Sequence, residues 1–187
     1  MKRTYTSIVS LLLGSLFLYS CETCENPTIT QISEADVAWL AYKENSRVNF
    51  ENEVGDIAPY KFISAVAQNV PGEGYSLGDD CIEKLDSQAS LTIQDTTRKH
   101  LNLSTYILRR PDSLTVRLAV QNRGDWPIDK DNPTYPSYDV NGHQYFNVFE
   151  VLPDSTKPNS VKQILFNKEF GFLHVSFYDG KSLTLKR

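Results

Sequence analysis

The stretch LNLSTYILRRPDSLTVRLAVQ, residues 101–121, decides the fold. In its second half every second residue is apolar: Leu114, Val116, Leu118 and Val120. This period of two is typical of a strand that presents one face to a core. In the first half, Leu101, Leu103 and Ile107 share a face, and the proline in Arg110-Pro111-Asp112 favours a tight turn. The stretch therefore predicts an antiparallel β-hairpin.

Strand-length apolar runs continue on both sides of this hairpin. Upstream they are Val48–Phe50, Tyr60–Ala67 and Cys81–Gln94; downstream they are Tyr138–Val140, His143–Leu152, Val161–Asn167, Phe172–Tyr178 and Lys181–Arg187. Asn141-Gly142 is a strong hairpin signal, and Asp179-Gly180 predicts another turn of type I′. Short connections require antiparallel pairing, because a parallel pair needs a long crossover. The sequence predicts a mainly β domain: a single antiparallel sheet of about nine strands, as a curved sheet, barrel or sandwich.

Three segments depart from the strand pattern. Ser33-Glu34-Ala35-Asp36 resembles a capped helix start, which predicts one short N-terminal helix ahead of Trp39 and Tyr42. Asp86–Gln88 interrupts a strand and indicates a bulge or a break. Residues 122–137 have no periodicity and predict a long loop, a kind of connection that often carries function.

The N-terminus has the layout of a secretory signal peptide. Lys2 and Arg3 precede the apolar run Ile8–Tyr19, which is shorter than the about 20 residues that a membrane span needs. We expect residues 1–20 to be removed. The expected domains are the signal peptide (1–20), a tether (21–32) and one β-rich domain (33–187).

The end of this signal, Leu18-Tyr19-Ser20-Cys21, resembles the lipobox of bacterial lipoproteins. The resemblance implies cleavage before Cys21, attachment of lipid to Cys21, palmitate among its acyl chains, and a membrane as partner. The acidic residues that follow are Glu22 and Glu25, and no Asp stands at the position that retains some lipoproteins in the inner membrane. We therefore expect a cell-envelope protein anchored in the outer membrane, with the leaflet left open.

Composition bears on the class of partner. The chain has 187 residues and a net charge of −4, and loss of Lys2 and Arg3 with the signal makes the net charge −6. A mildly acidic chain is a poor ligand for nucleic acid, because binding to phosphates needs clustered Lys and Arg.

Cysteine usage suggests one covalent link. If Cys21 takes lipid, Cys24 and Cys81 remain as a pair in an oxidising compartment. A Cys24–Cys81 disulfide is one hypothesis, and it would join the tether to the folded domain. The alternative is a free Cys24 in the tether and a small buried Cys81.

Catalytic and metal motifs are not recognisable in the sequence. His100, His143 and His174 stand apart from one another, without metal-ligand spacing. Asp125, Asp129, Asp131 and Asn132 offer oxygen ligands for Ca²⁺, but they lack the Gly and the distal Glu of an EF-hand, and a solvated acidic loop is favoured. Arg123-Gly124-Asp125 is a short match to the integrin-binding tripeptide. We expect no cofactor, no metal site and no enzyme.

The loop aromatics Trp126, Tyr135 and Tyr138 are the candidate binding residues. Exposed rings beside polar groups are typical of contact surfaces. The favoured alternative is that the rings fold back and cover one end of the sheet, since large aromatics are usually well buried.

Two stretches resemble small lipoproteins of Gram-negative bacteria that have no known activity: Trp39-Leu-Ala-Tyr42 leading to Phe50-Glu-Asn52, and Phe166–Gly171 followed by Leu173–Phe177 and Asp179-Gly180. The ending also resembles curved-sheet carriers of the LolA-like type. The resemblance implies an envelope location and β architecture. Two functions remain: a non-enzymatic module that binds a protein partner, with the sheet face filled, or a carrier that holds an apolar or lipid ligand on an open face.

Overall fold

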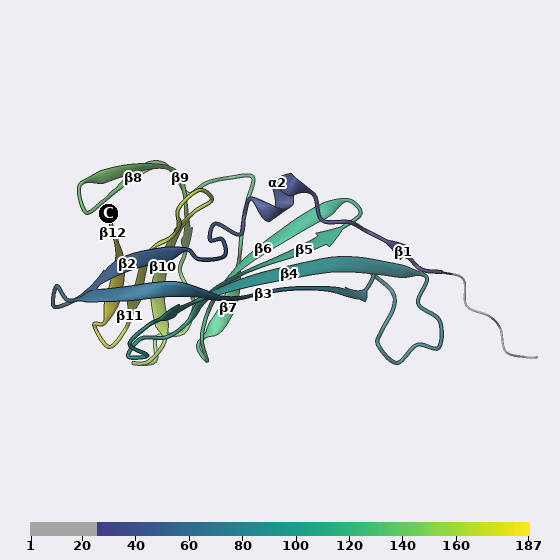
Figure 1. Cartoon of the computed structure of the whole chain (residues 1–187), viewed down its shortest axis with the longest axis horizontal. Helices are drawn as coiled ribbons and strands as arrows, with labels where there is room; N and C mark the ends of the chain where they lie inside the picture. Colours follow the sequence, from purple (N-terminus) through teal and green to yellow (C-terminus); the bar gives the residue numbers. More distant parts are fainter. Residues whose placement is uncertain (1–25) are drawn as a thin grey trace, which may run out of the picture.

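The computed structural model describes residues 26–187 as one curled sheet with a single short helix among these residues (Figure 1). From the N-terminus the elements are β1 (Thr28–Ile29), α2 (Glu34–Val37), β2 (Arg47–Asn52), β3 (Ile57–Pro71), β4 (Lys84–Asp95), β5 (Leu103–Arg110), β6 (Ser113–Val120), β7 (Gly124–Ile128), β8 (Tyr135–Val140), β9 (His143–Val151), β10 (Val161–Asn167), β11 (Gly171–Phe177) and β12 (Ser182–Lys186).

The sheet is antiparallel along its whole main path, which confirms the predicted fold class. The order is β7-β6-β5-β4-β3-β2-β12-β11-β10-β9-β8, and β1 joins β4 in parallel off this path. The twelve strands exceed the predicted number, about nine, because β1 and β7 are short and lack alternation. The sheet curls until β7 comes into contact with β9, so the arrangement is a half-barrel.

Strand β3 connects the two halves of the sheet. Residues Ile57–Lys61 pair with β2 on one edge, and the strand pairs with β4 from Tyr60 to Pro71 on the other. The ladder is interrupted by a bulge between Phe62 and Ser64. The bulge expected at Asp86–Gln88 is wrong: those residues pair regularly with β3, and the irregularity lies on the facing strand.

The β5–β6 hairpin is confirmed, with the predicted period of two along β6. Leu103, Ile107, Val116, Leu118 and Val120 are all buried on the concave face. Asn141-Gly142 closes β8 onto β9 with φ of 52° and 76°, as a type I′ turn requires. Only Gly180 of the second predicted type I′ turn has a positive φ, so that prediction is wrong; Phe177 and Lys181 bracket a three-residue loop instead.

The chain after α2 covers the concave face. Trp39 and Tyr42 are buried there, with the Trp39 ring edge-on to Phe149 at 5.3 Å between centroids. The Tyr42 hydroxyl accepts the backbone N–H of Phe172 at 2.9 Å. A sheet with one apolar face needs such a cover, and the segment between α2 and β2 provides it.

The expected loop at 122–137 is wrong over half of its length, because it contains β7 and the first half of β8. Both strands lie at the ends of the sheet, and each contains a proline, Pro127 and Pro136. Proline is tolerated at a sheet edge, where its missing N–H leaves no ladder bond unmade. This explains why two real strands have the composition of a loop.

The N-terminal predictions fall partly outside the described residues. The signal peptide, Cys21, Cys24 and the start of the tether lie in residues 1–25. The rest of the predicted tether is not free of the domain, since Thr28 and Ile29 pair with Lys84 and Leu85. No helix within residues 26–187 has the length and apolar character that a membrane span requires.

Candidate functional site

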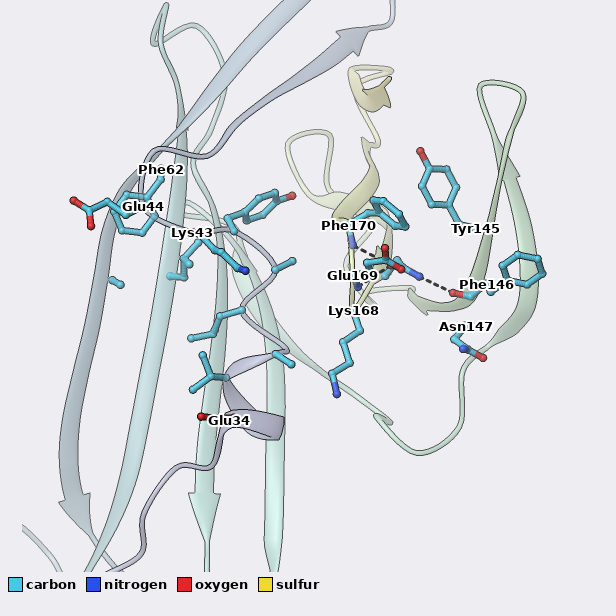
Figure 2. A pocket seen from close by; sticks show the side chains of 18 of the residues that line it. Glu34, Lys43, Glu44, Phe62, Tyr145, Phe146, Asn147, Lys168, Glu169 and Phe170 are labelled. Atoms are coloured by element: carbon cyan, nitrogen blue, oxygen red, sulfur yellow. Dashed lines mark hydrogen bonds between the residues drawn. The ribbon is translucent and has the colours of Figure 1, made fainter.

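A groove of about 990 Å³ opens between the two halves of the sheet (Figure 2). One wall is formed by the chain from Glu34 to Glu44 together with Phe62, Ala65 and Leu91 of β3 and β4. The facing wall consists of residues 144–147 of β9 and the β10–β11 turn, residues 167–170. The groove therefore lies where segments far apart in the sequence meet.

A capped helix turn positions the first wall. The Ser33 hydroxyl accepts the Asp36 N–H at 3.2 Å, and the Asp36 carboxylate accepts the Ser33 N–H at 2.9 Å, so the predicted cap is confirmed as a reciprocal capping box. The Asp36 carboxylate also lies 3.8 Å from the Arg109 guanidinium of β5. Burial alone raises the pKa of Asp36, but the Ser33 hydrogen bonds and Arg109 outweigh it, and the pKa is lowered. The charged carboxylate fastens the helix to the sheet.

Asn167 builds the second wall. Its side-chain Nδ2 donates to the Phe146 carbonyl at 2.6 Å, and its Oδ1 accepts the N–H groups of Glu169 and Phe170 at 2.8 and 3.0 Å. The side chain is buried, and it therefore ties the β10–β11 turn to β9. Sequence analysis missed Asn167, because its partner Phe146 is distant in sequence and no local pattern marks the contact.

Aromatic rings form part of the second wall of the groove. The Tyr145 ring is 2% exposed and meets the Phe170 ring edge-on at 5.3 Å. Its hydroxyl has no hydrogen-bond partner among residues 26–187. Burial is the largest influence on Tyr145 and raises its pKa. Burial likewise raises the pKa of Tyr42, so both phenols stay protonated and neutral.

The groove's charges are mixed and stand at its rim. They are Glu34, Lys43, Glu44, Lys168 and Glu169. The Lys168 ammonium lies 4.9 Å from the centre of the Trp39 ring, which ties that cation to an aromatic face. The lining within the described residues includes no Ser, Cys or His. The uncharged part of the lining, which includes Val37, Leu40 and Phe62, is suited to holding an apolar group.

The candidate aromatics lie away from this groove. Trp126 is half-buried on β7, opposite Leu118, and its ring packs over Gly124. Tyr135 and Tyr138 of β8 are half-buried and adjacent, with ring centroids 4.8 Å apart, and the Tyr135 hydroxyl donates to Glu150 at 2.9 Å. The structure brings the two tyrosines together and places Trp126 on a different strand. Their role in binding stays a prediction.

Cys81 is disulfide-bonded in the structure. The chain's other cysteines, Cys21 and Cys24, lie outside the described residues, so the pairing with Cys24 stays a prediction.

The three histidines stand apart in the structure as in the sequence. His100 binds Asp95, His174 contacts the Thr184 hydroxyl at 2.9 Å, and His143 is exposed. In the acidic loop, Asp129 accepts hydrogen bonds from Asp131 and Asn132. No cluster of His, Cys, Asp and Glu suited to a metal occurs within residues 26–187.

Comparisons of the chain with protein-family models, with curated proteins and with solved structures find no match.

Proposed function

We propose that this protein is a lipid-anchored, non-catalytic binding module of the bacterial cell envelope, and that the groove between its two half-sheets receives an apolar group of a protein partner. The observation that carries the proposal is the groove itself, an apolar cavity with a mixed-charge rim. Concave apolar surfaces with few polar groups are typical of binding sites.

The filled concave face supports a module over an open carrier. Trp39 and Tyr42 occupy the surface on which a sheet-bound lipid would have to lie. A residual groove remains beside them, and its near-balanced rim charges favour an uncharged group over an anion or a cation.

One observation favours the carrier as a second candidate. The groove volume of about 990 Å³ lies at the upper end of the range of small-molecule sites, roughly 300–1,000 Å³. In the carrier the same groove would enclose an acyl chain, and its lining includes Tyr145, whose hydroxyl is buried without a partner among the described residues.

Native mass spectrometry of the protein extracted from its own cells separates the two candidates. A co-purified protein subunit supports the binding module. An added mass of lipid size, released by organic solvent, supports the carrier and removes the first proposal.

Paired variants test the groove. Val37 lines the groove and is 48% exposed, so Val37→Glu should leave the fold intact and weaken partner binding at least tenfold. The matched control is Val54→Glu, at 73% exposure in the β2–β3 turn outside the groove lining, which should bind normally. Equal binding by both variants would contradict the groove as the site.

A further inference from the structure

We propose that the outer half of β3, residues 64–70, is a self-recognition edge that pairs with the same strand of a second copy of this chain. This segment has a neighbour on one side only. Strand β4 pairs with it throughout, whereas the contact with β2 and the residue before it ends at Phe62, whose N–H bonds to the Ser46 carbonyl. Residues 63–69 are exposed, including Ile63 at 40% and Val66 at 52%.

The register identifies which backbone groups are free. The N–H of Gly72 donates to the Lys84 carbonyl at 2.8 Å, and hydrogen-bonded pairs alternate along an antiparallel ladder. Even-numbered residues of this segment therefore bond to β4. The N–H and C=O groups of Ala65, Ala67 and Asn69 point away from β4, and no described strand pairs with them.

The edge carries none of the usual protections against pairing. Residues 62–72 contain no Asp, Glu, Lys or Arg, and residues 64–70 contain no proline. The two terminal strands of the same sheet, β7 and β8, do contain prolines, Pro127 and Pro136. Edge strands are normally blocked by charges, prolines or covers, because an open edge is a template for another strand.

The dimensions of the edge select a second copy as the occupant. The open stretch is bounded by β2 at Lys61 and by a turn after Pro71, in which the Tyr75 N–H bonds to the Gly72 carbonyl. Its midpoint is Ala67. A two-fold axis through Ala67 pairs Ala67 with Ala67 and Ala65 with Asn69, which uses all the outward backbone groups of both copies.

This arrangement is closed and free of like-charge contacts. The ladder between the copies covers residues 64–70 only, because the Phe62 N–H already bonds to the Ser46 carbonyl and each chain turns after Gly72. Small side chains meet at the centre of the contact between the two copies. On the concave face these are Ala65, Ala67 and Asn69. The isologous contact consumes both open edges, so the assembly stops at two copies.

A proline substitution in β3 tests the contact between the two copies and leaves the hydrogen bonds to β4 intact. Ala67→Pro removes only an outward N–H, so the variant should keep its strand spectrum and melting temperature while the dimer weakens at least tenfold. Ala67→Val, which keeps that N–H, is the matched control and should dimerise normally. The measurement is native mass spectrometry of the full detergent-extracted protein across micromolar concentrations.

Disulfide capture tests the register independently of any proline effect on folding. In the proposed pair the two Ala67 Cα atoms lie about 5.5 Å apart, within reach of a disulfide. Ala67→Cys should therefore give a reducible species of doubled mass in membranes. Ala65→Cys alone should not, because the two copies of residue 65 lie about 13 Å apart along the strands. The proposal would be overturned by a wild-type protein that stays monomeric at tens of micromolar, or by equal disulfide capture at residues 65 and 67. Open-ended aggregates, or a different peptide bound to this edge, would overturn it as well.

Discussion

At the scale of single residues, burial on β6 alternates as the sequence predicts. Leu118 is fully buried against β5 and β7, whereas Arg117 faces the convex side and pairs with Asp125. A buried leucine contributes transfer free energy and fills space. An exposed ion pair contributes little, because water screens it and two side chains must be ordered.

We expect Leu118→Ala to lower the free energy of unfolding by about 2–5 kcal/mol. Arg117→Ala should lower it by less than about 1 kcal/mol. Urea denaturation of the two variants measures the contrast. Large and equal losses would show that both faces of β6 are buried.

Gly171 is a residue whose identity depends on distant packing. Its φ is +79°, and a Cβ added there would lie on Cζ and Oη of Tyr42, far inside van der Waals contact. The hydroxyl of Tyr42 accepts the Phe172 N–H, so the side chain cannot move away without losing that bond. Gly180 shares the positive φ, at +88°, but has open space around it.

This pair of glycines separates backbone strain from steric overlap. Gly180→Ala should cost about 1 kcal/mol, for the left-handed conformation alone. Gly171→Ala should cost about 3 kcal/mol or more, because overpacking adds to that strain. Thermal unfolding of both variants checks the difference; equal costs would mean that Tyr42 yields freely.

At the scale of elements, the β4–β5 connection is organised by one carboxylate. Asp95 is fully buried and accepts hydrogen bonds from Thr97, Lys99 and His100, at 2.7–3.1 Å. Burial alone raises its pKa, but the hydrogen bonds from Thr97, His100 and Lys99 together outweigh burial and lower the pKa to about 2. The turn therefore depends on a charged Asp95.

Acid should weaken this turn in a defined pH window. The pKa of Asp95 is 3.8 before folding and about 2 in the folded chain, so its contribution is complete above about pH 4 and disappears towards pH 2. The loss amounts to about 2 kcal/mol. Denaturation curves between pH 5 and pH 2 should show a steeper decline for the wild type than for Asp95→Asn. Asp112→Asn, in the exposed β5–β6 turn, should follow the wild type.

At the scale of the whole molecule, the half-barrel leaves three unlike sheet borders. Two of them, β7 and β8, contain prolines, and the third is the open part of β3 beside the groove. The proposed lipid would hold the domain at a membrane surface.

The anchoring prediction concerns residues outside the described part of the chain. Cys21→Ala should leave an unprocessed precursor or release the protein from membranes, since the predicted lipid site is lost. Several acyl chains are expected, because one chain alone gives only marginal binding. Fractionation of cells expressing the variant checks this. A processed variant that still partitions into membranes would contradict lipidation at Cys21, and inner-membrane density would contradict the outer-membrane prediction.

The sequence by itself determined the β class, the β5–β6 hairpin, the helix cap at Ser33 and the Asn141-Gly142 turn. These features depend on residues within a few positions of one another, so period and turn chemistry suffice. It missed β7 and the first half of β8, because prolines at a sheet edge resemble a loop. Only the tertiary structure decided the groove, the roles of Tyr42, Gly171 and Asn167, and the open edge of β3. Each of these depends on contacts between residues far apart in the chain, such as Tyr42 with Phe172, which no local pattern encodes.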